Sequence, residues 1–276
     1  MDIELVLNSD VNTNANAYFD KAKKLKKKIG GIDMIVGKTK KEISELEEKR
    51  EEFLEKEEKR EKLVGLVKKE WYEKNFRFTF TSSGFLFVCG NDAQSNEVLL
   101  KKYLGAQDIV FHTEEAGSPF GLLKDAKNKA SEEDLFEVAQ FLACFSRQWK
   151  KGFGVADVFY VDPSQVSKQA QSGEYLAKGS FMVRGKKTFL KNIPLKICLG
   201  VETLKVKDEE SEEELESLRV ISGSEAMCTK RCGKRMVKLL PGGLQYKDLS
   251  KELKARLKFG VQDLPKFLPE GCRFEK

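Results

Sequence analysis

The chain has 276 residues, with 50 Lys and Arg against 44 Asp and Glu, a net charge of +6 and 34% charged residues. This length suits about two domains and excludes a tiny disulfide-held scaffold. The 40% hydrophobic residues include 19 Phe, enough for a buried core. No apolar run is longer than the five residues of Phe85–Cys89, which is too short to span a membrane, and the acidic N-terminus, Met1–Glu4, differs from a secretory signal. We expect a cytoplasmic protein with no membrane partner.

Six cysteines are scattered at positions 89, 144, 198, 228, 232 and 272. Most have apolar neighbours, which is typical of buried thiols in a reducing compartment. Only Cys228 and Cys232 have a spacing that suits a metal ion, and no second pair completes four ligands. We expect a plain turn of surface helix there, with zinc as the alternative, and no cofactor.

The first predicted element is a long helical arm. A series of seventeen positions, each three or four residues after the last, runs without a break from Ala15 to Trp71. Thirteen of these positions, which we call the seam, are apolar. A sustained 3.5-residue period predicts a coiled coil, with Asn12 or Thr13 capping its start. The arm is therefore expected to pack on another helix, such as that of a second copy.

Three glycines and a lysine run complicate the arm. Gly30, Gly31 and Gly37 would permit a hairpin turn. A continuous helix is favoured because the seam keeps its phase across them. The basic run from Lys21 to Lys28 is either a phosphate-binding surface or a solvated face of the coiled coil.

Beyond Trp71 the period changes to two. Phe76, Phe78 and Phe80 alternate with polar residues, and a turn then leads to a second strand at Phe85–Cys89, which predicts a hairpin. The elements expected next are a helix over Ser95–Tyr103, strands at Ile109–His112 and Gly121–Lys124, a helix opened by a capping box at Ser131, and strands near 155–161 and 180–184. These elements predict a mixed α+β core with antiparallel strands over 71–203.

The remaining chain changes in composition. Residues 202–216 hold eight acids, which predicts an acidic linker over 204–217. A small basic α/β appendage is expected over 218–276, with a strand at Met236–Leu240 and helices around Met227, over 246–258 and at Leu264–Leu268. The predicted fold class is α+β, with the coiled-coil helical arm over 1–70, the mixed core and this appendage.

The segment from Gln165 to Lys196 carries a local charge of +6. Its basic residues are Lys168, Lys178, Arg184, Lys186, Lys187, Lys191 and Lys196, against the single acid Glu174. Glycines at 173, 179 and 185 would give backbone N–H groups access to an anion. The pattern lacks the glycine spacing of a P-loop. Lys168, Lys178, Arg184, Lys186 and Lys187 are therefore our candidates for binding an RNA backbone.

A few polar residues are candidates for closer contacts to a nucleotide. His112 is the only histidine, so a multi-histidine metal site is excluded; it is either structural or contacts a nucleotide beside Glu114 and Asp92. Asp92, Gln94 and Asn96 are candidates for reading ribose or base edges. Helix capping by Asp92 is the alternative.

Several motifs, in the same order, resemble the NFACT-R domain of the NFACT family, which includes NEMF-like and RqcH-like proteins. They are Trp71–Lys74, Gly90–Glu97, Lys101–Leu104, Asp108–His112, Gln165–Lys168 and the run GEYLAKGSFMVRGKKTFL over 173–190. The arm resembles the coiled coil of the family, and Leu268–Gly271 resembles the ending of archaeal members.

This resemblance implies a tRNA-binding component of ribosome-associated quality control that acts on the obstructed large ribosomal subunit. The resemblance does not extend to the family's NFACT-N domain. We therefore expect a separate NFACT-N chain as a partner, and no peptide elongation by this chain alone. The alternative is a general RNA- or DNA-binding module without a ribosomal role. No nucleophile–base pair is apparent, so we expect no catalytic residues.

The seam generates a first prediction. Ile43→Asp with Leu46→Asp should convert a dimer to a monomer, or abolish partner binding, because both changes place charge in an apolar seam. Light scattering measures the mass. Lys40→Asp with Ser44→Asp, which places the same acids off the seam, should leave the mass unchanged. A wild-type chain that is already monomeric, with a protease-sensitive arm, would contradict self-association.

Overall fold

The computed structural model describes residues 4–5, 7–8, 10–66, 70–115, 117–168, 178–207, 214–261 and 263–275. The chain forms two compact units, Met1–Gly65 and Leu66–Lys276, which are described separately. None of the helices within the described ranges has an apolar stretch of the length that a bilayer requires.

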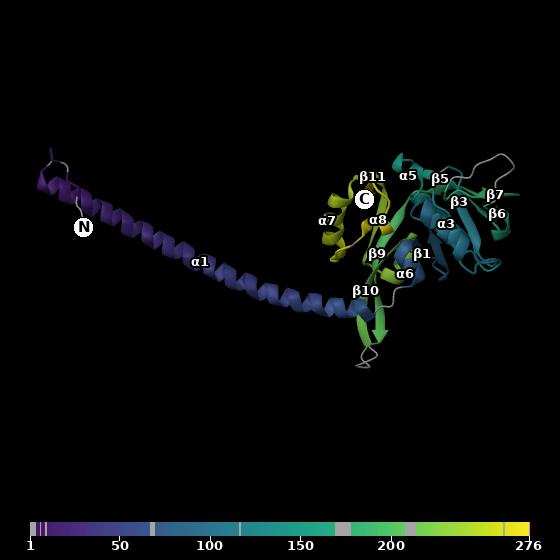
Figure 1. Cartoon of the computed structure of the whole chain (residues 1–276), viewed down its shortest axis with the longest axis horizontal. Helices are drawn as coiled ribbons and strands as arrows, with labels where there is room; N and C mark the ends of the chain where they lie inside the picture. The colour runs from purple at the N-terminus through teal and green to yellow at the C-terminus, as the bar shows by residue number, and fades with distance from the viewer. Residues whose placement is uncertain are drawn as a thin grey trace. The chain divides into compact units, whose positions relative to one another are not determined.

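The first unit consists mainly of α1 (Val11–Leu66), a single helix of 56 residues (Figure 1). Gly30, Gly31 and Gly37 all lie within it, so the continuous helix is confirmed over the hairpin. The large apolar seam residues from Tyr18 to Leu46 remain 41% to 64% exposed. The described part of the seam therefore presents an uncovered apolar stripe.

The ends of the arm differ from the prediction. Asp10, rather than Asn12 or Thr13, caps α1, because its carboxylate accepts a hydrogen bond of 2.6 Å from the Thr13 N–H. This bond lowers the pKa of Asp10. Trp71 does not continue the seam. It begins α2 (Trp71–Asn75), and its ring stacks on Tyr103 with centroids 4.0 Å apart.

The second unit is built on a six-stranded antiparallel sheet of order β1-β2-β4-β3-β5-β8. The predicted hairpin is confirmed, with Phe78 paired to Val88. The strands are β1 (Arg77–Phe80), β2 (Leu86–Cys89), β3 (Ile109–Thr113), β4 (Gly121–Leu123), β5 (Val155–Val161) and β8 (Thr188–Pro194). The edge strand β8 was not predicted, because most of its side chains face solvent and give no alternating signal.

Helices cover both faces of this sheet. On one face α4 (Glu132–Cys144) packs with Val158, and on the other α2 and α3 (Ala93–Lys102) pack with Phe159. The predicted capping box of α4 is confirmed: Ser131 Oγ accepts from the Asp134 N–H at 3.2 Å, and the Asp134 carboxylate accepts from the Ser131 N–H at 3.0 Å.

A second, four-stranded antiparallel sheet has the order β10-β9-β11-β12. Its strands are β9 (Ile197–Lys207), β10 (Glu214–Gly223), β11 (Met236–Leu244) and β12 (Cys272–Phe274). The remaining elements are α5 (Arg147–Lys150), α6 (Glu225–Cys232), α7 (Tyr246–Leu257), α8 (Leu264–Phe267), a 3-10 turn (Pro163–Gln165) and a two-stranded ribbon of β6 (Val166–Ser167) and β7 (Met182–Val183).

The structure differs from the expected acidic linker over 204–217. Residues 204–207 belong to β9 and residues 214–217 to β10, while 208–213 lie outside the described residues. Lys205 lies opposite Glu216, so the acids of β10 can face bases of β9 across the hairpin. The expected boundary at 203 falls inside β9, and a single core contains both Val158 and Leu253.

Cys228 and Cys232 also differ from expectation. Both are buried on α6, in a small core with Cys198, Ile221 and Met227, rather than on a surface turn. Over the described ranges, no group of three His, Cys, Asp or Glu side chains is arranged to hold a metal ion.

A buried carboxylate ties the second sheet to its neighbours. Glu202 is 4% exposed and accepts hydrogen bonds from Arg219 Nε at 2.6 Å and Arg231 Nε at 2.9 Å. Arg219 also donates to Glu73 of α2 at 3.1 Å. The network therefore holds α2, α6 and the β9–β10 hairpin together.

Replacing Arg219 tests this network. Arg219→Ala should lower the free energy of unfolding by about 1–3 kcal/mol, because the buried Glu202 loses one of its two charged partners. Urea denaturation followed by circular dichroism measures the change. Lys101→Ala, which removes the exposed pair with Glu97 on α3, should cost less than about 1 kcal/mol. Equal losses for the two variants would contradict the role given to Arg219.

Candidate nucleic-acid interface

A pocket with a volume of about 590 Å³ lies beside the start of α3. Its walls come from β1, the start of α3, the segment from His112 to Phe120, the α4–α5 junction and residues 178–181. Of the residues predicted from the sequence, Asp92, Asn96, His112 and Lys178 line it. Its volume lies within the range of small-ligand sites.

Asp92 and Asn96 fix the start of α3. Asp92 Oδ1 accepts from the Ser95 N–H at 2.7 Å, and the bond lowers the pKa of Asp92. Asn96 is buried, and its Oδ1 accepts from the Phe120 N–H at 3.1 Å. Capping thus describes the contacts of Asp92, while Gln94 is exposed and lies outside the pocket lining.

His112 forms part of an aromatic wall. Its Nε2 lies 3.2 Å from the Ser118 carbonyl oxygen, and its ring centroid lies 4.2 Å from that of Phe120 and 5.8 Å from that of Phe159. Burial lowers the pKa of His112, so the imidazole is neutral at pH 7. The neutral ring can donate its Nε2 proton to Ser118 and leave a flat apolar surface beside the pocket.

Sequence reasoning missed three basic residues of the pocket, Arg77, Arg147 and Lys150. Arg77 donates to the Gly90 carbonyl at 3.1 Å and lies over the Phe145 ring at 4.5 Å. Arg147 and Lys150 are exposed on α5, three residues apart and therefore on one face of the turn. That spacing beside buried Trp149 is the signal that could have identified them. With Lys178, four basic side chains meet one acid, Asp92.

Two of the predicted lysines extend this surface. Lys168 Nζ lies 4.9 Å from the ring centroid of Phe181, whose ring contacts Phe120, and it pairs with Glu97 at 3.3 Å. Lys187 Nζ lies 4.4 Å from the ring centroid of Phe159. Both lysines therefore lie at the same aromatic cluster as His112.

Arg184 and Lys186 lie on a fixed turn outside the pocket lining. Gln165 Nε2 donates to the Arg184 carbonyl at 2.8 Å and the Lys186 carbonyl at 3.0 Å. Gly185 has a φ of 80°, which favours glycine. Both basic side chains are exposed, so the turn can present them to an anion.

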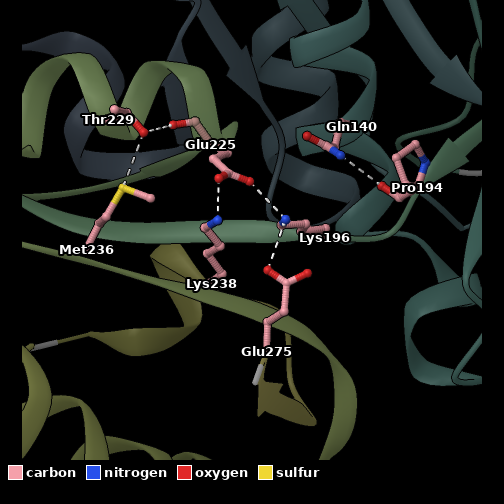
Figure 2. A network of polar contacts seen from close by, with 8 residues as sticks. All are labelled: Gln140, Pro194, Lys196, Glu225, Thr229, Met236, Lys238 and Glu275. Atoms are coloured by element: carbon pink, nitrogen blue, oxygen red, sulfur yellow. Dashed lines mark hydrogen bonds and ion pairs between the residues drawn. The ribbon is translucent and has the colours of Figure 1, made fainter. Parts of the chain in front are cut away.

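Other parts of the basic segment differ from the expectation. Lys196 is turned inward and pairs with Glu225 at 2.9 Å and Glu275 at 3.0 Å (Figure 2). Gly179 packs on Ala93: an added Cβ would lie 2.5 Å from Ala93 Cα, so this glycine positions residues 178–181 rather than opening the backbone to an anion. Gly173 lies outside the described residues.

The pocket combines cationic side chains, aromatic faces, and the hydroxyl groups of Ser118 and Ser180. This set matches a ligand that carries both a phosphate and a flat ring. Residues 74–185, which contain every lining residue of the pocket, match the family model described as the NFACT protein RNA binding domain. The pocket therefore lies within the part of the chain that matches an RNA-binding domain.

Similar proteins are known in several organisms. The archaeal Rqc2 homolog aRqcH of Methanocaldococcus jannaschii is 45% identical over 134 residues, or 49% of this chain and 20% of that protein. The ribosome quality control complex subunit NEMF of Homo sapiens is 29% identical, over 87% of this chain and 22% of that protein. The NEMF homolog of Drosophila melanogaster is 32% identical, over 73% of this chain and 20% of that protein. The chain belongs to the NFACT family, and it spans about a fifth of the length of these relatives.

One solved structure, the C-terminal part of the fibronectin/fibrinogen-binding protein from Streptococcus suis, is similar at 20% identity with a TM-score of 0.37. The similar region covers 67% of this chain and 77% of the Streptococcus suis chain. The identity and the TM-score are too low for this structure to define the fold.

The half-buried imidazole of His112 predicts a pH effect on stability. The folded protein resists protonation of His112, whereas the unfolded chain binds the proton near the usual pKa of 6.5. The contribution of His112 to the free energy of unfolding is therefore fully present above pH 6.5 and is lost as the pH falls below that value. The stability advantage of wild type over His112→Gln should be larger at pH 7.5 than at pH 5.5 in urea denaturation. An advantage that grows in acid would contradict a neutral His112 ring in the folded protein.

Proposed function

We propose that this chain binds RNA by holding one nucleotide in the pocket. The observation that carries the proposal is the meeting of Arg77, Arg147, Lys150 and Lys178 with an aromatic wall in one pocket of an RNA-binding domain. Positive charge and stacking surfaces act on different parts of a nucleotide, so one pocket can use both.

Each wall has its own part in binding. Arg147, Lys150 and Lys178 neutralise a phosphate, and a base lies against Phe120 and Phe181 at the aromatic wall. Lys168, Lys187, Arg184 and Lys186 follow the adjoining backbone. The capped start of α3 and the Gln165-held turn keep these groups in place before RNA arrives, which reduces the entropic cost of binding.

The proposed setting is ribosome-associated quality control, because the similar proteins carry names from that process. There the RNA is tRNA on the obstructed large ribosomal subunit, and a chain with an NFACT-N domain is the proposed partner. Phosphate contacts position RNA without reading its sequence, so different tRNAs should bind within about 1–3 kcal/mol of one another. We propose a binding role rather than catalysis.

A salt titration of tRNA binding tests the pocket. Arg147→Ala, Lys150→Ala and Lys178→Ala together should weaken binding and reduce the slope of log K against log salt by about 0.7 per lost contact. Arg184→Ala, Lys186→Ala and Lys187→Ala should act in the same direction. The control removes the same charge from α7, with Lys247→Ala, Lys251→Ala and Lys254→Ala. Unchanged affinity and slope in the pocket variant would overturn the proposed interface.

The ribosomal setting is tested separately by co-sedimentation with large subunits that carry peptidyl-tRNA. The wild-type chain should sediment with them, and the pocket variant should not. Binding to free tRNA without binding to subunits would favour a general RNA-binding module. Elongation of the stalled peptide by this chain alone would overturn the binding-only role.

A further inference from the structure

A second concavity, with a volume of about 670 Å³, lies between α4, β5, β8 and the start of α6. Its large apolar side chains are Leu135, Phe136, Tyr160 and Leu190. Phe136 is 42% exposed, although it belongs to the otherwise largely buried helix α4. An exposed phenyl ring in a hollow marks a surface on which another apolar side chain can be buried.

The charged residues of this groove all have one sign. Glu132, Glu133, Glu137 and Glu225 line it, and its described lining contains no Lys or Arg. Glu132 and Glu133 are exposed in the first turn of α4. We call this hollow, as defined by these four acids and four apolar residues, the acidic groove.

Polar contacts hold the walls of the acidic groove. Figure 2 shows Gln140 donating to the Pro194 carbonyl, at 3.2 Å, and Glu225 paired with Lys196 and Lys238. Glu137, in turn, accepts from the Ser82 N–H at 2.7 Å. The groove is therefore preformed.

These contacts also divide the acids by role. Glu225 is already neutralised by two lysines, and Glu137 is committed to a backbone amide. Glu132 and Glu133 enter no ion pair with the described residues. They are the charges that remain for a ligand.

We propose that the acidic groove docks a basic amphipathic helix of a partner protein. Apolar side chains of that helix pack on Phe136 and Leu190, while its Lys or Arg residues face Glu132 and Glu133. Such a helix presents apolar anchors every three or four residues and can keep its cations on the flank. The same carboxylates repel RNA, so this surface serves a different class of ligand from the basic pocket.

The test uses the full chain and a fluorescein-labelled 14-residue peptide of Leu and Lys, with Leu at helical spacing. Fluorescence anisotropy should show saturable binding of the peptide to the wild-type chain. Binding should be at least tenfold weaker for the Phe136→Ser variant and for the double variant Glu132→Lys with Glu133→Lys. Two controls should bind like wild type. Phe153→Ser removes another exposed Phe, and Asp248→Lys with Glu252→Lys reverses two acids on α7.

Matched peptides separate docking from simple charge attraction. A peptide with Ser in place of Leu, and one with Glu in place of Lys, should both bind at least tenfold more weakly. If the peptide of Lys and Ser bound as tightly as the peptide of Leu and Lys, the proposed packing of apolar side chains in the groove would be overturned.

A photoreactive leucine in the Leu and Lys peptide keeps the proposal testable if a variant fails to fold. Crosslinks on wild type should map by mass spectrometry to residues 132–140, 190 or 224–226. Crosslinks confined to other segments would overturn the proposed site.

Discussion

The complete burial of the second half of α4, from Glu137 to Cys144, is the constraint on which the second unit depends. Every residue from Glu137 to Cys144 is buried, and a helical segment that is buried all round requires neighbours on every face. The six-stranded sheet supplies Phe87 and Phe111, and the second sheet supplies Leu199 and Val220. Because this helix contacts both sheets within a single core, the two sheets form one folded unit rather than a domain with an appendage.

The sequence predicted those elements whose inward positions have a clear period. β1, β2 and β5 carry apolar residues on both faces or in strict alternation, and the capping box at Ser131 marks the start of α4. Edge strands and charged hairpins lack such signals. In β8 only Ile193 is fully buried. In β9 and β10 the acids interrupt the apolar pattern, and the sequence does not show that Glu202 is buried with hydrogen bonds from two arginines.

The candidate site was predictable in part, for the same physical reason. Local composition located the basic segment and the Asp92–Asn96 turn, because both are continuous in sequence. The contributions of Arg77, Arg147 and Lys150 depend on tertiary contacts, since β1 and the end of α4 meet only in the folded sheet. Lys196 shows the converse: its charge belongs to the basic segment, but the folded chain pairs it with Glu225 and Glu275.

The two ends of α4 carry opposite surfaces. Acids occupy its first turn, at the acidic groove, and Arg147 and Lys150 follow its last turn, at the basic pocket. Both placements agree with the helix dipole, so neither surface opposes the stability of the helix. A helix of 13 residues is about 20 Å long, more than twice the screening length of about 8 Å in physiological salt. Each end can therefore present its own charge, and one core can hold an RNA and a basic helix without the two competing.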